Sequence, residues 1–233
     1  MSLIETSVHM DRATVVAWYA QKSHRLAKLI EGLHRAASRS CGSGFTPRPP
    51  SDVHATILGL EEPAPNVPRD LGGVLRYLAS EFERRPLEVQ FGGFADTDRR
   101  MLSRGRTFRE RSLCMQGERL VLIGWPMAPA PSPRLGDIRR RCERYGFRHK
   151  YHQQPEDLDP DVYLVVGDMA NPSPAAAAGL VERLRREILA TPVRVSLTVD
   201  DVILVEYADT RLQAATSTWW PISGGIPRPR RGC

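Results

Sequence analysis

The sequence has few cysteines and no long hydrophobic run. Its four cysteines show none of the C-x-x-C spacings typical of metal or redox sites, so we expect free thiols rather than a disulfide framework. No apolar run approaches the roughly 20 residues that a membrane-spanning helix needs. The first residues, "MSLIETSVHMDR", lack the basic and then apolar order of a signal peptide. These absences predict a cytoplasmic protein without a membrane partner.

Clusters with the spacing of metal ligands are also missing, so we expect no metal and no other cofactor. The charge is one-sided, because 33 Lys and Arg face 27 Asp and Glu, which gives a net charge of +6, and arginine far outnumbers lysine. Guanidinium groups pair with phosphate oxygens in a planar fork, so this composition suits a phosphate-rich partner. A coding bias toward arginine explains the same composition, and the charge alone therefore leaves the partner open.

The pattern of apolar residues predicts a mixture of helices and strands. A chain of 233 residues is long enough for one large domain or two small lobes. The clearest helix is predicted over residues 11–38, where Leu26, Leu29, Ile30 and Leu33 recur at helical spacing. Other helices are predicted over 70–85, 133–147 and 172–190. Strands are predicted over 53–60, 86–94, 108–116, 118–125, 161–169, 193–208 (two strands) and 216–222, with a tight turn at Gly117.

One predicted strand, "SDVHATILGL" over residues 51–60, carries a histidine and a threonine two positions apart. Side chains alternate between the two faces of a strand, so His54 and Thr56 share one face while Val53, Ala55 and Ile57 share the other. The polar pair is either part of a site or the polar edge of an ordinary sheet.

A second strand–loop–helix–strand unit follows later in the chain with nearly the same spacing. From His54 to Pro86 there are 86 − 54 = 32 residues, and from Asp161 to Pro192 there are 192 − 161 = 31. Both units have a Pro-rich loop after the first strand. The match predicts an internal duplication; the alternative is chance, because strand–helix–strand order is common.

A duplicated unit that begins H-x-T, followed by an apolar residue, resembles the two-histidine (2H) phosphoesterase superfamily. That group includes bacterial RNA 2′,3′-cyclic phosphodiesterases, often called 2′-5′ RNA ligases, and nucleotide cyclic phosphodiesterases. The resemblance covers about residues 50–210, and "HATILGL" matches the first family motif. The second motif commonly reads P-H-x-T-L, whereas this chain has "PDVYL", with Asp161 and Tyr163 in place of the histidine and the threonine.

The resemblance implies an α+β fold in which two lobes of antiparallel sheet, related by duplication, face each other across a central cleft with helices outside. We therefore expect residues 1–46 to form an N-terminal helical extension and residues 47–222 to form the two-lobed domain. The lobes are placed at about 47–130 and 131–222. Residues 223–233 are expected to form a flexible basic tail.

The resemblance also implies roles for the four motif residues. His54 is carried over as a catalytic acid or base, and Thr56 as a donor to a phosphate oxygen. Asp161 either shares the proton transfer with His54, with Tyr163 as a second hydroxyl donor, or is an ordinary turn residue of a site that has lost activity. The expected function is a metal-independent phosphodiesterase acting on 2′,3′-cyclic or 2′-5′-linked nucleotide or RNA ends.

Two other functions remain open at this stage. The first alternative is a catalytically inactive module on the same fold that binds a nucleotide or an RNA end. A further alternative is a scaffold whose N-terminal helix drives oligomerisation. The missing second histidine separates the enzyme from the binding module, because turnover needs a substitute acid and binding does not.

Three further groups are candidates for substrate binding. An arginine-rich segment over residues 96–112 either clamps an RNA backbone or is a solvated loop; its candidate residues are Arg99, Arg100, Arg104 and Arg106. His149 and His152 precede the second motif and either replace the missing histidine or belong to a solvated loop. Trp125 either stacks on a base or belongs to the core.

Overall fold

The computed structural model describes residues 8–95, 106–127, 130–152, 154, 159–209, 211–223 and 230–231. The strands are β1 (Ala13–Ala17), β2 (Phe45–Pro47), β3 (Ala55–Gly59), β4 (Leu87–Phe91), β5 (Leu113–Gln116), β6 (Arg119–Pro126), β7 (Val162–Met169), β8 (Val193–Leu197), β9 (Val202–Glu206), β10 (Thr218–Pro221) and β11 (Arg230–Arg231). The α-helices are α1 (His24–Cys41), α2 (Leu71–Arg84), α3 (Phe108–Ser112), α4 (Arg134–Arg141) and α5 (Pro174–Glu187). Short 3-10 helices are η1 (Met10–Arg12), η2 (Gly42–Gly44), η3 (Pro50–Asp52), η4 (Cys142–Tyr145) and η5 (Val199–Asp201).

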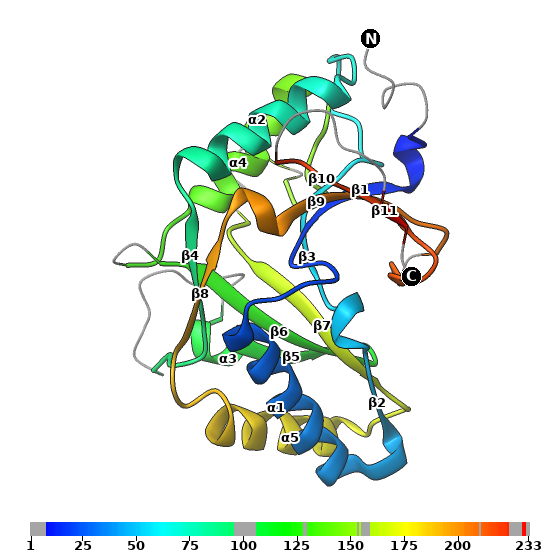
Figure 1. Ribbon diagram of the computed structural model, residues 1–233. Helices are drawn as coiled ribbons and strands as arrows, with labels where there is room; N and C mark the ends of the chain where they lie inside the picture. Colours follow the sequence, from blue (N-terminus) through cyan, green and yellow to red (C-terminus); the bar gives the residue numbers. More distant parts are fainter. Residues whose placement is uncertain are drawn as a thin grey trace.

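The strands form one curled antiparallel sheet, so the expected α+β class is confirmed (Figure 1). Its order is β11-β10-β9-β1-β3-β7-β6-β4-β8, with β2 paired to β7 and β5 paired to β6. In the described part of the chain, no helix combines the length and the apolar composition needed to cross a bilayer. Cys41, Cys114 and Cys142 are free thiols, as expected, and Cys233 lies outside the described residues.

Helices begin where the sequence supplies capping side chains. Ser23, Asp70 and Ser173 each accept a backbone N–H at the first turn of α1, α2 and α5, which satisfies one of the donors that a helix start leaves unpaired. Helix α1 packs against β7, β8 and α5, and α2 packs against η4 and η5. Figure 1 accordingly shows α1 beside α5 below the sheet, and α2 with α4 above it.

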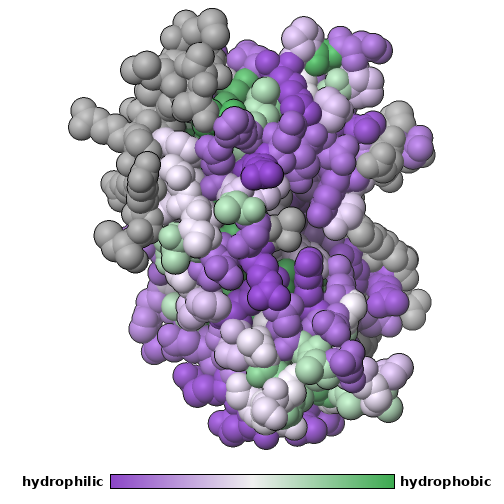
Figure 2. All heavy atoms as spheres, turned by 90° about the vertical axis from the view of Figure 1, so that its right-hand side faces the viewer, coloured by the Kyte–Doolittle hydropathy of each residue, from purple (hydrophilic) through white to green (hydrophobic). Residues whose placement is uncertain are grey.

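The apolar residues of these elements form the core, and the surface is mainly polar. The predicted stripe of Leu26, Leu29, Ile30 and Leu33 is fully or almost fully buried. The face drawn in Figure 2 carries mostly hydrophilic side chains, and its hydrophobic ones occur in small groups.

The sheet is weakly joined at one place, between β3 and β7. These strands share a single residue pair, Ala55 with Leu164, whereas β1–β3 has four pairs and β6–β7 has six, each ladder with one register shift. We call β10-β9-β1-β3 the first half of the sheet and β7-β6-β4-β8 the second half. The opening between β3 and β7 matters for the site, because the predicted motif residues lie on these two strands or one residue before them.

The helix predicted over residues 11–38 is wrong in its first part. Residues 13–17 form β1, which lies between β3 and β9 in the middle of the sheet, and the helix begins only at His24. Thr14, Val15 and Val16 are β-branched and buried, as expected of a strand covered on both faces. The expected helical extension over residues 1–46 therefore includes a central strand of the sheet.

Three other boundaries also differ from the sequence predictions. The halves of the sheet do not follow the expected lobes at 47–130 and 131–222, because β4 and β6 pair within the second half with β8 and β7. Residues 108–112 form α3 rather than a strand, since Thr107 and Glu110 make a capping box. In the expected tail, Arg230–Arg231 pairs with β10, and residues 224–229 and 232–233 lie outside the described residues.

Candidate functional site

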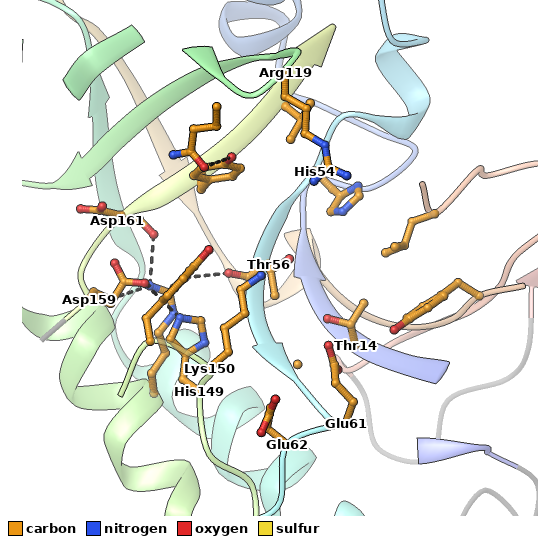
Figure 3. A pocket seen from close by; sticks show the side chains of 18 of the residues that line it. Thr14, His54, Thr56, Glu61, Glu62, Arg119, His149, Lys150, Asp159 and Asp161 are labelled. Carbon is orange, nitrogen blue, oxygen red and sulfur yellow. Dashed lines mark hydrogen bonds and ion pairs between the residues drawn. The ribbon is translucent and has the colours of Figure 1, made fainter. Parts of the chain in front are cut away.

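A cavity of about 340 Å³ lies where β3 and β7 separate (Figure 3). Four of its lining residues are the predicted motif residues His54, Thr56, Asp161 and Tyr163. The buried face of β3 carries Val53, Ala55 and Ile57, so the alternation predicted for this strand is confirmed. A volume of this size is at the lower end of pockets that hold small molecules.

His54 has a defined tautomer in this cavity. Its Nδ1 lies 2.7 Å from the backbone oxygen of Asp52, and because a carbonyl oxygen only accepts, Nδ1 carries the proton. The lone pair of the neutral ring therefore resides on Nε2. Burial lowers the pKa of His54 to about 4, and the nearby cations Arg48 and Lys22 act in the same direction. His54 is thus a neutral base near pH 7.

Two arginines make the His54 end of the cavity positive. Arg48 and Arg119 both line it, and each is close enough to affect the ionisation of Tyr163. Arg48 Nε lies 3.7 Å from Asp168 Oδ2, whereas Arg119 makes no ion pair with any residue that the structure describes. Figure 3 places the side chain of Arg119 beside His54. This end has the charge and the donors to bind an anion.

Tyr163 adds a protonated hydroxyl to the same region. Burial raises the pKa of Tyr163 to about 12, and its hydroxyl donates to Gln116 Oε1 at 2.7 Å. Gln116 also lines the cavity. The hydroxyl is therefore a neutral donor that is held by a neutral acceptor.

Asp161 is enclosed by partners. Trp125 Nε1 donates to its Oδ1 at 2.6 Å, and an Arg111 guanidinium nitrogen lies 2.6 Å from its Oδ2. The side chains of Asp161 and Arg111 are only 5% and 8% exposed, so this is a buried ion pair. Both carboxylate oxygens are therefore engaged by strong donors. Asp161 is arranged to hold Arg111 rather than to donate a proton.

Arg139 of α4 connects the two strands where their ladder is broken. Its guanidinium donates to the backbone oxygens of Thr56 and Ile57 on β3, at 2.6 and 2.9 Å. It also donates to the oxygens of Asp159 and Asp161, at 2.5 and 3.1 Å, just before β7. The side chain is only 2% exposed. Arg139 thus fixes the distance between the motif residues of β3 and those of β7.

His149 and His152 occupy different environments. His149 lines the cavity, and its Nε2 donates to Asp159 Oδ2 at 3.0 Å. Burial lowers the pKa of His149 to about 4, so the ring is neutral near pH 7. His152 is 1% exposed, accepts the backbone N–H of Asp159 at 3.3 Å and does not line the cavity. Neither histidine is in a solvated loop, and only His149 can contact a ligand directly.

Two of the remaining predicted binding residues, Trp125 and Arg106, are described by the structure and do not line the cavity. Trp125 is 1% exposed and packs against Phe94 and Phe108, so it offers no free face to a base and the stacking prediction is wrong. Arg106 is exposed and does not line the cavity. Arg99, Arg100 and Arg104 lie outside the described residues.

Sequence reasoning missed the arginines that line the cavity, namely Arg48, Arg111, Arg119 and Arg139. A signal existed for Arg139, because it occupies a helical stripe with Leu135, Ile138 and Cys142, which are all buried. An arginine in such a stripe indicates a buried guanidinium with specific partners. Arg111 lies in the arginine-rich segment over residues 96–112 but is not among its predicted binding residues, and Arg48 and Arg119 have no local signal.

Among the described residues, no group of three or more His, Cys, Asp or Glu side chains is placed to hold a metal ion. No protein-family model matches the chain, and no curated protein matches it either. A function for this protein therefore has to be argued from the side chains of the cavity.

Proposed function

We propose that this protein is a metal-independent phosphodiesterase of the two-histidine type, acting on 2′,3′-cyclic or 2′-5′-linked nucleotide or RNA ends. The observation that carries the proposal is the hydrogen bond from His54 Nδ1 to the Asp52 carbonyl oxygen, which leaves Nε2 as a base at the positive end of the cavity. A phosphodiester is the group that such a site suits, because it needs cations for its oxygens and a base for the attacking water.

The proposed reaction uses His54 as the base. Its Nε2 takes a proton from water while the water oxygen bonds to phosphorus, and the bond from phosphorus to the leaving sugar oxygen breaks. Arg48 and Arg119 stabilise the charge that develops on the phosphate oxygens, and Thr56 is a further donor. A bound phosphate also favours the protonated imidazole, which strengthens the base during the reaction.

The leaving sugar oxygen needs a proton, and Tyr163 is the proposed source. Its hydroxyl is protonated at neutral pH and lines the cavity with His54. After the transfer, the phenolate recovers a proton and His54 loses one, so that one water is consumed per bond cleaved. The Tyr163 hydroxyl has to leave Gln116 for this step, which makes the acid the weaker part of the proposed site.

The order of elements supports the proposed duplication and its two lobes. Apart from the short β2 between α1 and β3, the chain runs β1-α1-β3-α2 and later β6-α4-β7-α5, and β3 and β7 are the adjacent inner strands of the two halves. This comparison relates residues 13–84 to residues 119–187, a longer repeat than the one based on His54 and Asp161 alone. The broken ladder between β3 and β7 is then the boundary between the lobes.

A binding module without turnover is the second candidate, and the state of Asp161 favours it. The residue at the position of the second histidine is held in a buried ion pair with Arg111. A site with one base and no well-placed acid can still bind a phosphate. In this case the cavity recognises a nucleotide or RNA end and does not cleave it.

The two candidates are separated by a turnover assay on 2′,3′-cyclic mononucleotides and 2′-5′-linked dinucleotides, with a chelator present. If the protein is an enzyme, His54→Gln should lower kcat by about 10²–10⁴, the usual contribution of a positioned base. His24→Gln is the matched control, because His24 is exposed and does not line the cavity. Binding without turnover supports the module, and activity that survives His54→Gln refutes the proposed mechanism.

A further inference from the structure

The end of the cavity away from Arg119 is rich in hydrogen-bond acceptors. Glu61 and Glu62 follow β3 and line the cavity there, and Figure 3 shows both at the opposite end of β3 from His54. Neither carboxylate makes an ion pair or a side-chain hydrogen bond with a residue in the described ranges. Ionised carboxylates only accept hydrogen bonds, so this end suits a ligand group that carries several N–H donors.

A buried histidine nitrogen supplies an independent sign of a ligand. His149 is 3% exposed and lines the same cavity, and its Nδ1 has no hydrogen-bond partner in the part of the chain that the structure describes. Because Nε2 donates to Asp159, Nδ1 is the unprotonated nitrogen of the neutral ring. A buried acceptor without a partner costs stability, and a donor from a ligand would remove this cost.

An exposed aromatic ring lies beside these acceptors. Tyr151 is 38% exposed, and it is the one large hydrophobic side chain that is exposed among the described residues. It lines the cavity and meets His149 edge to face, with ring centroids 5.5 Å apart. Exposed aromatic rings are the common stacking partners of unpaired RNA bases.

The two ends of the cavity are separated by the length of β3. At about 3.3 Å per residue, Gly59 lies roughly 16 Å along the strand from His54. A phosphate held beside His54, Arg48 and Arg119 therefore leaves room for a sugar and a base before the carboxylates are reached. Arg48 and Arg119 lie at the His54 end, and Glu61 and Glu62 lie at the other. Lys150 also lines the cavity, and its Nζ lies 4.9 Å from the centre of the Tyr151 ring.

We propose that Glu61 and Glu62, together with His149 and Tyr151, select a guanine base on the nucleotide or RNA end that the cavity binds. Guanine presents N1–H and the N2 amino group side by side, so a carboxylate can accept both hydrogen bonds at once, whereas uracil offers one N–H and adenine and cytosine one amino group. This inference rests on the proposed function, since it assumes that the phosphate occupies the His54 end.

The test is calorimetric binding of 2′,3′-cyclic GMP, IMP, AMP, CMP and UMP, with His54→Gln used if the wild type cleaves them. Cyclic GMP should bind roughly ten- to hundredfold more tightly than cyclic UMP, the discrimination expected of a bidentate contact. The affinity for cyclic IMP, which lacks the N2 amino group, should lie between those for cyclic GMP and cyclic UMP. Glu61→Gln and Glu62→Gln should reduce the preference for cyclic GMP, because an amide presents a donor as well as an acceptor. The Kd of cyclic UMP should change by no more than about twofold in either variant.

Glu83→Gln is the matched control, because Glu83 is exposed on α2 and does not line the cavity. Equal affinity for all five nucleotides, unchanged by the Glu61 and Glu62 variants, overturns the guanine assignment and leaves the proposed function intact. If no nucleotide binds at all, the proposed function fails and the base assignment fails with it.

Discussion

Strands β3 and β7 bring corresponding motif residues to one cavity, but the two sides differ in how many partners these residues have. Just before β3, His54 donates from one ring nitrogen to a backbone oxygen and keeps the lone pair of the other. Just before β7, Asp161 has an indole donor on one oxygen and a guanidinium on the other. The first side retains a group that can take up a proton, whereas the second side is part of the scaffold.

His54 and Asp161 hold matching positions in the proposed duplication, but their surroundings differ. The Asp161 carboxylate is paired with Arg111 from α3, a segment with no counterpart in the motif itself. The cavity then gains a fixed cation in place of a second base. Under the proposed function, phosphate is held from both sides of the cavity and protons move mainly on the His54 side.

The largest expected effect comes from removing the carboxylate. Asp161→Ala leaves the Arg111 guanidinium buried without its anion, and breaking a buried pair in this way costs about 3–5 kcal/mol of stability. Thr56→Ala on the opposite strand should cost about 1 kcal/mol or less, because the Thr56 side chain is half-buried and its bond to Arg139 uses the backbone oxygen. Urea unfolding followed by circular dichroism measures both changes. Equal losses for the two variants would mean that the two sides do not differ as described.

The next largest effect is expected from placing a histidine at position 161, as the proposed two-histidine mechanism would have it. In Asp161→His the ring cannot neutralise Arg111, and a histidinium would repel it. Turnover of a 2′,3′-cyclic nucleotide should therefore fall by at least tenfold, measured in a folded preparation of the variant. A rise in turnover would instead identify Asp161 as the decayed form of a two-histidine site.

The local part of this architecture was predictable from the sequence. Period-two alternation around His54 predicted which face of β3 is polar, and the apolar stripe of α1 predicted its buried side. The first helix was extended too far because residues 13–17 are apolar apart from Thr14. Such a run is ambiguous between a buried helix and a central strand, although its β-branched residues and Ser23, the N-cap of α1, favoured the strand.

The electrostatic part of the site was not predictable, because it depends on contacts between distant segments. Asp161 meets Arg111 and Trp125 only after β6 and β7 have paired, and Arg139 reaches β3 from 82 residues away in the sequence. Spacing along one strand carries no information on such partners. Sequence patterns therefore located the cavity-lining strands and left open which side keeps a usable proton acceptor.

A smaller effect concerns His149, on the β7 side of the cavity. Its pKa is about 4 in the folded protein and near 6.5 in the unfolded chain, so between these values the unfolded state binds the extra proton. The contribution of His149 to the free energy of unfolding is therefore complete above about pH 6.5 and is lost as the pH falls toward 4. At pH 5 the loss from this residue alone is about 2 kcal/mol. His149→Gln removes the titrating group and keeps a side-chain amide near Asp159. Urea unfolding at pH 7 and pH 5 should show a shallower pH dependence in the variant, and an unchanged dependence contradicts the assignment.

The smallest expected effect tests the cation beside His54. Arg119 lines the cavity and has no ion-pair partner in the ranges that the structure describes, so Arg119→Ala should leave stability nearly unchanged. It should weaken the binding of a cyclic nucleotide by about tenfold, in the range of one lost hydrogen bond to a charged group. For a short RNA with a 2′,3′-cyclic end, the salt dependence of log Kd should also become less steep by about one unit.

Arg106→Ala is the control, because Arg106 is an exposed arginine outside the cavity. Equal losses of affinity in both variants would indicate a general charge effect. Unchanged binding in Arg119→Ala would show that phosphate does not bind at the His54 end of the cavity.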